Sequence, residues 1–146
     1  MPEQETIERA REDAREGKSP STQAGEFVRE EMEHIREGKH GARSAKQAIA
    51  IGLSKARRAG VKLPPPKQGS ARTKKQAARD SRKAGSRHKP SRRRSRAVQK
   101  ALKREPSAAA SHRALSRQAR SAARRRTKAS RSRAAKKAAR TRKRNR

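Results

Sequence analysis

The chain of 146 residues carries 45 lysines and arginines against 13 acidic residues, giving a formal net charge of +32, and only 1% of its residues are aromatic. It contains no cysteine, which excludes disulfide bonds and thiolate metal sites. The longest apolar stretch, residues 48–53, is too short to cross a membrane, and the acidic N-terminus is unlike a secretory signal peptide. We therefore expect a protein of the cytoplasm and nucleoid whose partner is a polyanion.

The charge divides the chain into three blocks. Residues 1–38 hold six basic and eleven acidic residues, and residues 39–66 hold seven basic residues and no acidic one. Residues 67–146 hold 32 basic residues against Asp80 and Glu105, which we expect to form local ion pairs. Such asymmetry is typical of a small folded head that bears an interaction tail.

The head is predicted to be helical. Residues 1–20 indicate an acidic helical segment. Its residues are good helix formers, but we expect the helix to be frayed because it has little apolar face to pack against the rest of the head. A helical hairpin is predicted over residues 21–63, with helices at about 21–38 and 44–60. A Pro/Gly linker at residues 64–70 then ends the head.

The second hairpin helix is the best specified element of the chain. Ser44 and Gln47 form a capping-box pattern at its start, and Gly60 suits the left-handed residue that follows a helix. Gly52 lies on its apolar arc, where the missing side chain lets another helix approach closely. The expected hairpin core consists of Val28, Met32, Ile35, Ile49, Leu53 and Ala56.

The two hairpin helices differ in charge. The acidic residues of the first helix are expected to complement the basic outer face of the second; these are Glu26, Glu30, Glu31, Glu33 and Glu37. An additional basic face is expected from Lys46, Lys55, Arg57 and Arg58. Ile51 falls outside the apolar arc and either is exposed or contacts a partner or a second copy.

The stretch from Glu26 to Pro66 carries the core "S-x-KQAIAIGLS-x-ARRAG" after a short acidic helix and a Gly-Lys turn. This core resembles a family of small bacterial proteins known only as a domain of unknown function. The resemblance implies a bacterial source and supplies no activity. The Ala/Arg/Lys-rich tail resembles the tails of linker histones and bacterial histone-like proteins, although it is richer in arginine.

Residues 71–146 predict a basic, intrinsically disordered tail with transient helices. The tail has too little apolar surface to offset the ordering of its backbone. Its alanine blocks favour helix once charge repulsion is neutralised, and Gly85, Pro90 and Pro106 divide it into short segments. The expected fold class is therefore mostly α and disordered.

The tail also predicts the nucleic-acid contacts. Each Lys or Arg that neutralises a phosphate releases a condensed counterion, which makes binding tight at low salt. Without aromatic residues or a folded reading element, the contacts are expected to reach phosphates rather than bases. The predicted contact residues are Lys74, Lys75, Arg79, Arg82, Lys83, Arg92, Arg93, Arg94, Arg96, Lys100, Lys103, Arg104, Arg113, Arg117, Arg120, Arg124, Arg125, Arg126, Lys128, Arg131, Arg133, Lys136, Lys137, Arg140, Arg142, Lys143, Arg144 and Arg146.

The sequence predicts neither a catalytic nor a metal site. His34, His40, His88 and His112 are far apart in the sequence and lack a ligand spacing, which indicates solvated side chains. No nucleophile–base arrangement is recognisable. We therefore expect no enzyme, no cofactor and no small-molecule substrate.

Sequence-nonspecific DNA binding by a nucleoid-associated, histone-like protein is the function expected first, with the hairpin serving self-association or a protein partner. The alternative is an RNA-binding or ribosome-associated basic protein. A third hypothesis is an adaptor whose acidic helical head binds a protein partner and shields the tail. Membrane binding is not expected, because the tail lacks an apolar face.

Overall fold

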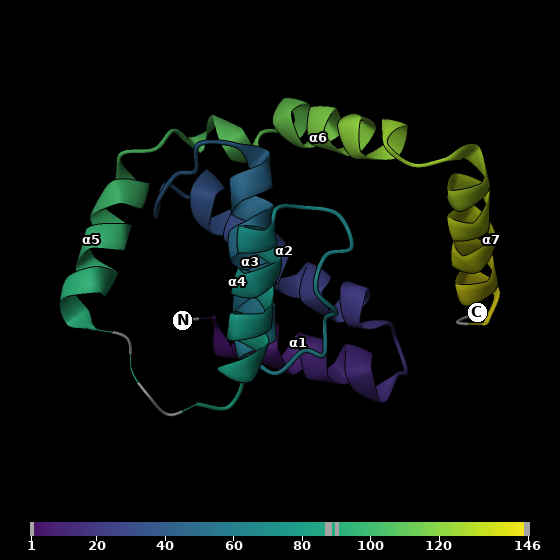
Figure 1. The fold of residues 1–146 in the computed structure, drawn as a ribbon, viewed down its shortest axis with the longest axis horizontal. Helices are drawn as coiled ribbons and strands as arrows, with labels where there is room; N and C mark the ends of the chain where they lie inside the picture. The colour runs from purple at the N-terminus through teal and green to yellow at the C-terminus, as the bar shows by residue number, and fades with distance from the viewer. Residues whose placement is uncertain (1, 87–88, 90, 145–146) are drawn as a thin grey trace. The chain divides into compact units, whose positions relative to one another are not determined.

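The computed structural model describes residues 2–86, 89 and 91–144, and in these residues the chain consists of helices and loops without a β-strand (Figure 1). Its compact units are Met1–Ser111 and His112–Arg146. The helices of the described residues are α1 (Gln4–Arg15), α2 (Pro20–Arg36), α3 (Ala45–Arg58), α4 (Ala71–Arg82), α5 (Arg92–Lys103), the short 3-10 helix η1 (Ser107–Ala110), α6 (His112–Arg124) and α7 (Lys128–Arg144).

The prediction of a long disordered tail is wrong. Over its described residues the basic half of the chain forms α4, α5, η1, α6 and α7. Local signals account for these helices: Ser70 Oγ caps α4 by accepting a hydrogen bond from Thr73 N at 3.2 Å, and Thr127 Oγ1 accepts one from Ser130 N at 3.2 Å. Alanine and arginine, which dominate these segments, are strong helix formers. The low apolar content limits the core without excluding helix.

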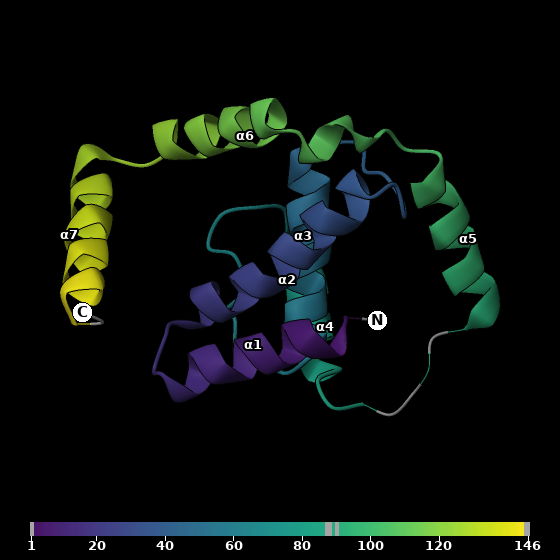
Figure 2. The ribbon, with the colours of Figure 1, turned by 180° about the vertical axis from the view of Figure 1, so that it is seen from behind.

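The first helix is packed rather than frayed. α1 and α2 lie side by side in both views (Figure 2), and the α1 residues Thr6 and Ala10 are buried. Ala10 joins Phe27 in the core cluster. At the start of α1, Glu3 N donates to Glu30 Oε2 at 3.1 Å. The acidic N-terminal segment is therefore a structural part of the head.

Helices α1, α2 and α3 each end at a glycine in the left-handed conformation, Gly17, Gly38 and Gly60, with φ of 70°, 74° and 99°. The residue after each glycine donates to the carbonyl group five residues earlier, as Val61 N does to Ala56 O at 3.1 Å. This pair of features is the Schellman motif. The left-handed glycine predicted for the end of the second hairpin helix is confirmed.

The start of α3 also follows its sequence signal. Ser44 Oγ accepts a hydrogen bond from Gln47 N at 3.2 Å, and Gln47 Oε1 accepts one from Arg43 N at 2.8 Å. The glutamine therefore reaches one residue further back than in a standard capping box.

Helices α2 and α3 approach each other closely at Gly52. A Cβ atom at this position would lie 2.7 Å from Val28 Cα and 3.0 Å from Phe27 O. The other residues that α3 buries against its neighbours are mostly alanines: Ala45, Ala48 and Ala56. Small side chains thus let the two backbones come together, as Gly52 predicted.

The hairpin core differs in part from the expected one. Met32, Ile35 and Ala56 are buried, whereas the structure leaves Val28, Ile49 and Leu53 half-buried, and Ile51 as well. Phe27, which the predicted core omitted, is only 1% exposed and is the largest fully buried side chain. The buried face of α2 is thus centred on Phe27 rather than on its neighbour Val28.

Asp80 holds α4 against α3. Its side chain is only 1% exposed, and it accepts hydrogen bonds from Ser54 Oγ, from Arg58 Nε at 2.9 Å and from Gln76 Nε2 at 3.1 Å. Ala77 is buried on the same face of α4. The local ion pair expected for Asp80 is in fact a tertiary contact across 22 residues.

This contact predicts a pH-dependent stability. Burial would raise the pKa of Asp80, but the hydrogen bonds from Ser54, Arg58 and Gln76 outweigh burial and lower it. The stabilisation is therefore fully present above the unfolded pKa of about 3.9 and is lost as the pH falls through the folded pKa. We expect Asp80→Asn to lower the free energy of unfolding at neutral pH by about 1–3 kcal/mol. Urea denaturation as a function of pH should show this difference narrow in acid; a constant difference would contradict the assignment.

The end of α5 and the segment that follows it return to the head. Gly41 N donates to Leu102 O at 2.9 Å. A side chain at Gly41 would overlap the carbonyl group of Glu105, so the two backbones are in direct contact. The last two alanines of η1 are buried, and η1 contacts α2 and α3. The first compact unit therefore extends to Ser111, well beyond the linker at residues 64–70.

Candidate nucleic-acid interface

One face of α6 carries a row of arginines. Successive members are four, three and four residues apart, so helical periodicity places them on the same side. The row extends along about 16 Å of the helix axis. Its members are Arg113, Arg117, Arg120 and Arg124.

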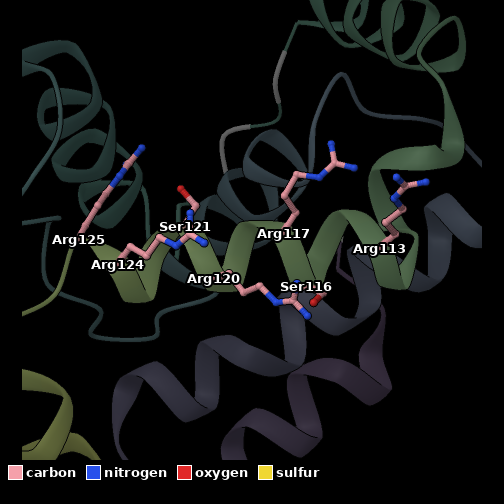
Figure 3. A pocket seen from close by; sticks show the side chains of 7 residues that line it. All are labelled: Arg113, Ser116, Arg117, Arg120, Ser121, Arg124 and Arg125. Atoms are coloured by element: carbon pink, nitrogen blue, oxygen red, sulfur yellow. The ribbon is translucent and has the colours of Figure 1, made fainter. Parts of the chain in front are cut away.

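These arginines line an open groove together with Ser116, Ser121 and Arg125 (Figure 3). Figure 3 shows the guanidinium groups spread along the helix and toward both edges of this face, without converging on one point. A converging set would suit one small anion, whereas a spread row suits the successive charges of a polyanion. Ser116 and Ser121 add hydroxyl groups of a kind that donates to phosphate oxygens.

All predicted contact residues that the structure describes are exposed. They lie on α4, α5, α6 and α7 and in the adjoining loops; Arg146 lies outside the described residues. Besides the α6 row, a smaller set gathers on the exposed face of α4, where Arg72, Lys75 and Arg79 line a second hollow. On α7 the basic residues lie all around the helix, because they do not repeat at helical spacing.

The charge of these helices is not neutralised within their own units. In the described part of the first unit, no ion pair includes a lysine or arginine of α4 or α5; Asp80 pairs with Arg58, and Glu105 lies 3.9 Å from Arg43. The second unit contains sixteen basic residues and no acidic one. Positive charge at this density is available to an external polyanion.

Most acidic residues of the head form ion pairs with basic residues of the head. Arg9 Nε lies 3.0 Å from Glu26 Oε2, and Arg29 Nε lies 3.0 Å from Glu33 Oε1. These contacts join α1 to α2 and brace α2 along its own length. They leave less free acidic surface for a protein partner than the sequence indicated.

Lys55, expected on an outer basic face of α3, instead faces two buried carboxylates. Its Nζ lies 2.7 Å from Glu31 Oε2 and 3.2 Å from Glu30 Oε1. Burial would raise the pKa of Glu30, but hydrogen bonds from Thr6, from Glu3 N and the charge of Lys55 lower it. The complementarity predicted between the two hairpin helices therefore lies in their interface.

The other three residues of that expected face have different environments. Arg57 is buried, and its Nη2 donates to Pro64 O at 3.2 Å; burial lowers the pKa of Arg57. Arg58 pairs with Asp80, and Lys46 is exposed. The contribution of α3 to a basic surface is thus smaller than the sequence indicated.

The structure brings together two histidines that are separate in the sequence. The rings of His34 and His40 meet edge to face with centroids 6.1 Å apart, and Glu31 lies beside them. Both rings are half-buried, so the expectation of solvated side chains was wrong for this pair. The turn after α2 places His40, which no ligand spacing along the helix could reveal. His112 is exposed, and His88 lies outside the described residues.

Residues 17–68 match a family of unknown function, DUF6496. The matched segment contains α2, α3 and the turn between them, and it leaves the basic helices α4–α7 outside. Neither a curated protein nor a solved structure matches the chain. Among the described residues, no helix combines the length and apolar character needed to span a membrane.

Proposed function

We propose that the protein binds nucleic acid without sequence preference, with duplex DNA as its main target, by neutralising backbone phosphates along α4–α7. The arginine row of α6 is the observation that carries this proposal. Duplex DNA presents one negative charge per about 1.7 Å of its axis, so a row about 16 Å long can reach several phosphates at once.

The character of the contacts supports binding without sequence preference. Arginines on a single helix face carry long side chains, and among the described residues no carboxylate holds those of α6 in one orientation. Base reading requires side chains fixed against base edges, whereas phosphate contacts tolerate this freedom. In this proposal the protein acts in the nucleoid in the manner of histone-like proteins, and the helical head anchors the basic helices.

Titration of the full chain against duplex DNA and structured RNA of equal length, over a salt series, tests the proposal. For 6–10 phosphate contacts we expect log K to fall against log salt with a slope of about −5 to −9, independently of DNA sequence. Direct competition should favour the duplex. RNA preference would replace DNA as the target and favour a ribosome-associated role. Absent or salt-independent binding would overturn the proposal.

A further inference from the structure

We propose that Glu31, His34 and His40 form a binding site for one divalent transition-metal ion, with zinc the best-suited candidate. The three residues lie at the end of α2 and in the turn that follows it, and one ligand atom from each lies within 4.8 Å of the others. Two imidazole rings and one carboxylate are a ligand set that zinc takes, with the fourth position left to water. The site is independent of the nucleic-acid interface.

One of the distances between ligand atoms already suits a bound zinc ion. His40 Nε2 lies 3.3 Å from Glu31 Oε1. A tetrahedral zinc ion with bonds of about 2.0–2.1 Å places neighbouring ligand atoms about 3.3–3.4 Å apart. The nitrogen of His34 has to approach by at most about 1.5 Å, which rotation about side-chain bonds supplies.

Partners outside the cluster hold both histidine rings. His40 Nδ1 lies 3.1 Å from Gly41 O, which directs Nε2 toward Glu31. His34 Nε2 lies 2.8 Å from Glu3 Oε1, whereas Nδ1 lies 4.0 Å from Glu30 Oε1, beyond hydrogen-bond distance, so that Nδ1 stays available to a metal. Metal-binding histidines characteristically give their second nitrogen to a backbone carbonyl or a carboxylate, as these two do.

The carboxylate of Glu31 is buried without a well-formed hydrogen bond. Its side chain is 1% exposed, and among the described residues neither oxygen has a hydrogen-bonding partner of good geometry. Lys55 Nζ lies 2.7 Å from Oε2 and balances charge on that side, whereas Oε1 faces His40. A buried polar atom left without a partner is costly, and a metal ion bound at Oε1 removes that cost.

The site joins structurally important segments. Glu3 belongs to the start of α1, and Gly41, next to His40, donates to Leu102 O across the contact that returns the chain to the head. A bound ion therefore stabilises the turn on which this contact depends. We expect zinc to raise the melting temperature of the full chain and to slow hydrogen exchange at the Gly41 amide.

Titration of the untagged full chain with Co²⁺, followed by displacement with Zn²⁺, tests the site. We expect one equivalent of Co²⁺ with the absorption bands of a tetrahedral ion. Glu3→Gln should weaken binding by about 10–100-fold and His40→Gln by at least about 100-fold. His112→Gln is the matched control, because this exposed histidine lies outside the cluster, and it should leave the affinity unchanged.

A readout on the unmodified chain removes dependence on the folding of the variants. Zinc should shift the NMR ring signals of His34 and His40 and leave those of His112 in place. Failure to bind one equivalent, or equal losses in His40→Gln and His112→Gln, would overturn the proposal. Unshifted His34 and His40 rings would show that His40 and Glu31 form an ion pair only.

Discussion

Replacement of the four α6 arginines by glutamine (Arg113→Gln, Arg117→Gln, Arg120→Gln and Arg124→Gln) is expected to make DNA binding much less sensitive to salt. The loss of four phosphate contacts should reduce the slope of log K against log salt by about 3.6. Between 50 and 200 mM salt, the affinity of this variant should therefore fall by a factor roughly 100-fold smaller than that of the wild type. Glutamine and arginine have similar helix propensities, so α6 should persist, as circular dichroism can verify.

The control for this variant removes the same charge from the head and from the linker that follows it. The four exposed cations chosen lie outside the predicted contacts: Arg11→Gln, Arg15→Gln, Lys62→Gln and Lys67→Gln. For this head variant, the slope of log K against log salt should change by less than about 0.9, the equivalent of one phosphate contact. The remaining effect of net charge acts over distance and is screened by salt. If the head variant and the α6 variant lowered the slope equally, net charge rather than the α6 row would determine binding.

Gly52→Ala is expected to destabilise the protein by about 1–2 kcal/mol. The added Cβ would lie 2.7 Å from Val28 Cα, and backbone atoms cannot rotate away as side chains do. Because the clash is with backbone, the cost should lie in the upper part, about 2–3 kcal/mol, of the usual range for overpacking, and it exceeds the gain of about 1 kcal/mol from replacing glycine inside a helix. Chemical denaturation of the full chain measures the net effect.

Gly25→Ala provides the matched comparison. Gly25 also lies inside a helix, but an added Cβ would meet no atom within 4 Å. Only the propensity gain remains, so we expect this variant to be more stable than the wild type by up to about 1 kcal/mol. Opposite signs at the two glycines would establish the close approach of α2 and α3. A stabilising Gly52→Ala would show that the two helices are free to separate.

The errors in the predicted core have a specific physical cause. The predicted core took Val28, Met32 and Ile35 from the first hairpin helix, but Phe27 is also within reach of that face. At Gly52 the backbone of α3 meets α2 beside Val28, which stays half-buried, while the neighbouring Phe27 is the residue that is fully buried in the core. Helical periodicity predicts which side of a helix is buried. It does not predict which of two adjacent residues near that side is buried more deeply.

The basic half shows the limit of a composition argument. Its few large apolar residues correctly excluded an extensive core of its own, and no residue of α5, α6 or α7 is buried. Its helices need no such core, because caps such as Ser70 and the abundance of alanine and arginine act within single segments. The prediction of disorder treated the absence of a core as the absence of secondary structure.

By itself, the sequence determined the features that depend on neighbouring residues. The glycine end of α3, the cap at Ser44, and the exposure of the described lysines and arginines of the tail all follow from residue type and short spacing. Charge counts likewise place the excess of positive charge after residue 66.

Only the tertiary structure decided which distant residues meet. It buried Asp80 against Ser54 and Arg58, turned Lys55 from a basic face to Glu30 and Glu31, and brought the rings of His34 and His40 together. The physical reason is how far apart in the sequence the interacting residues lie. Caps and helix ends are settled by bonds within a few residues, whereas a buried charge is stabilised only by the partner that packing places beside it.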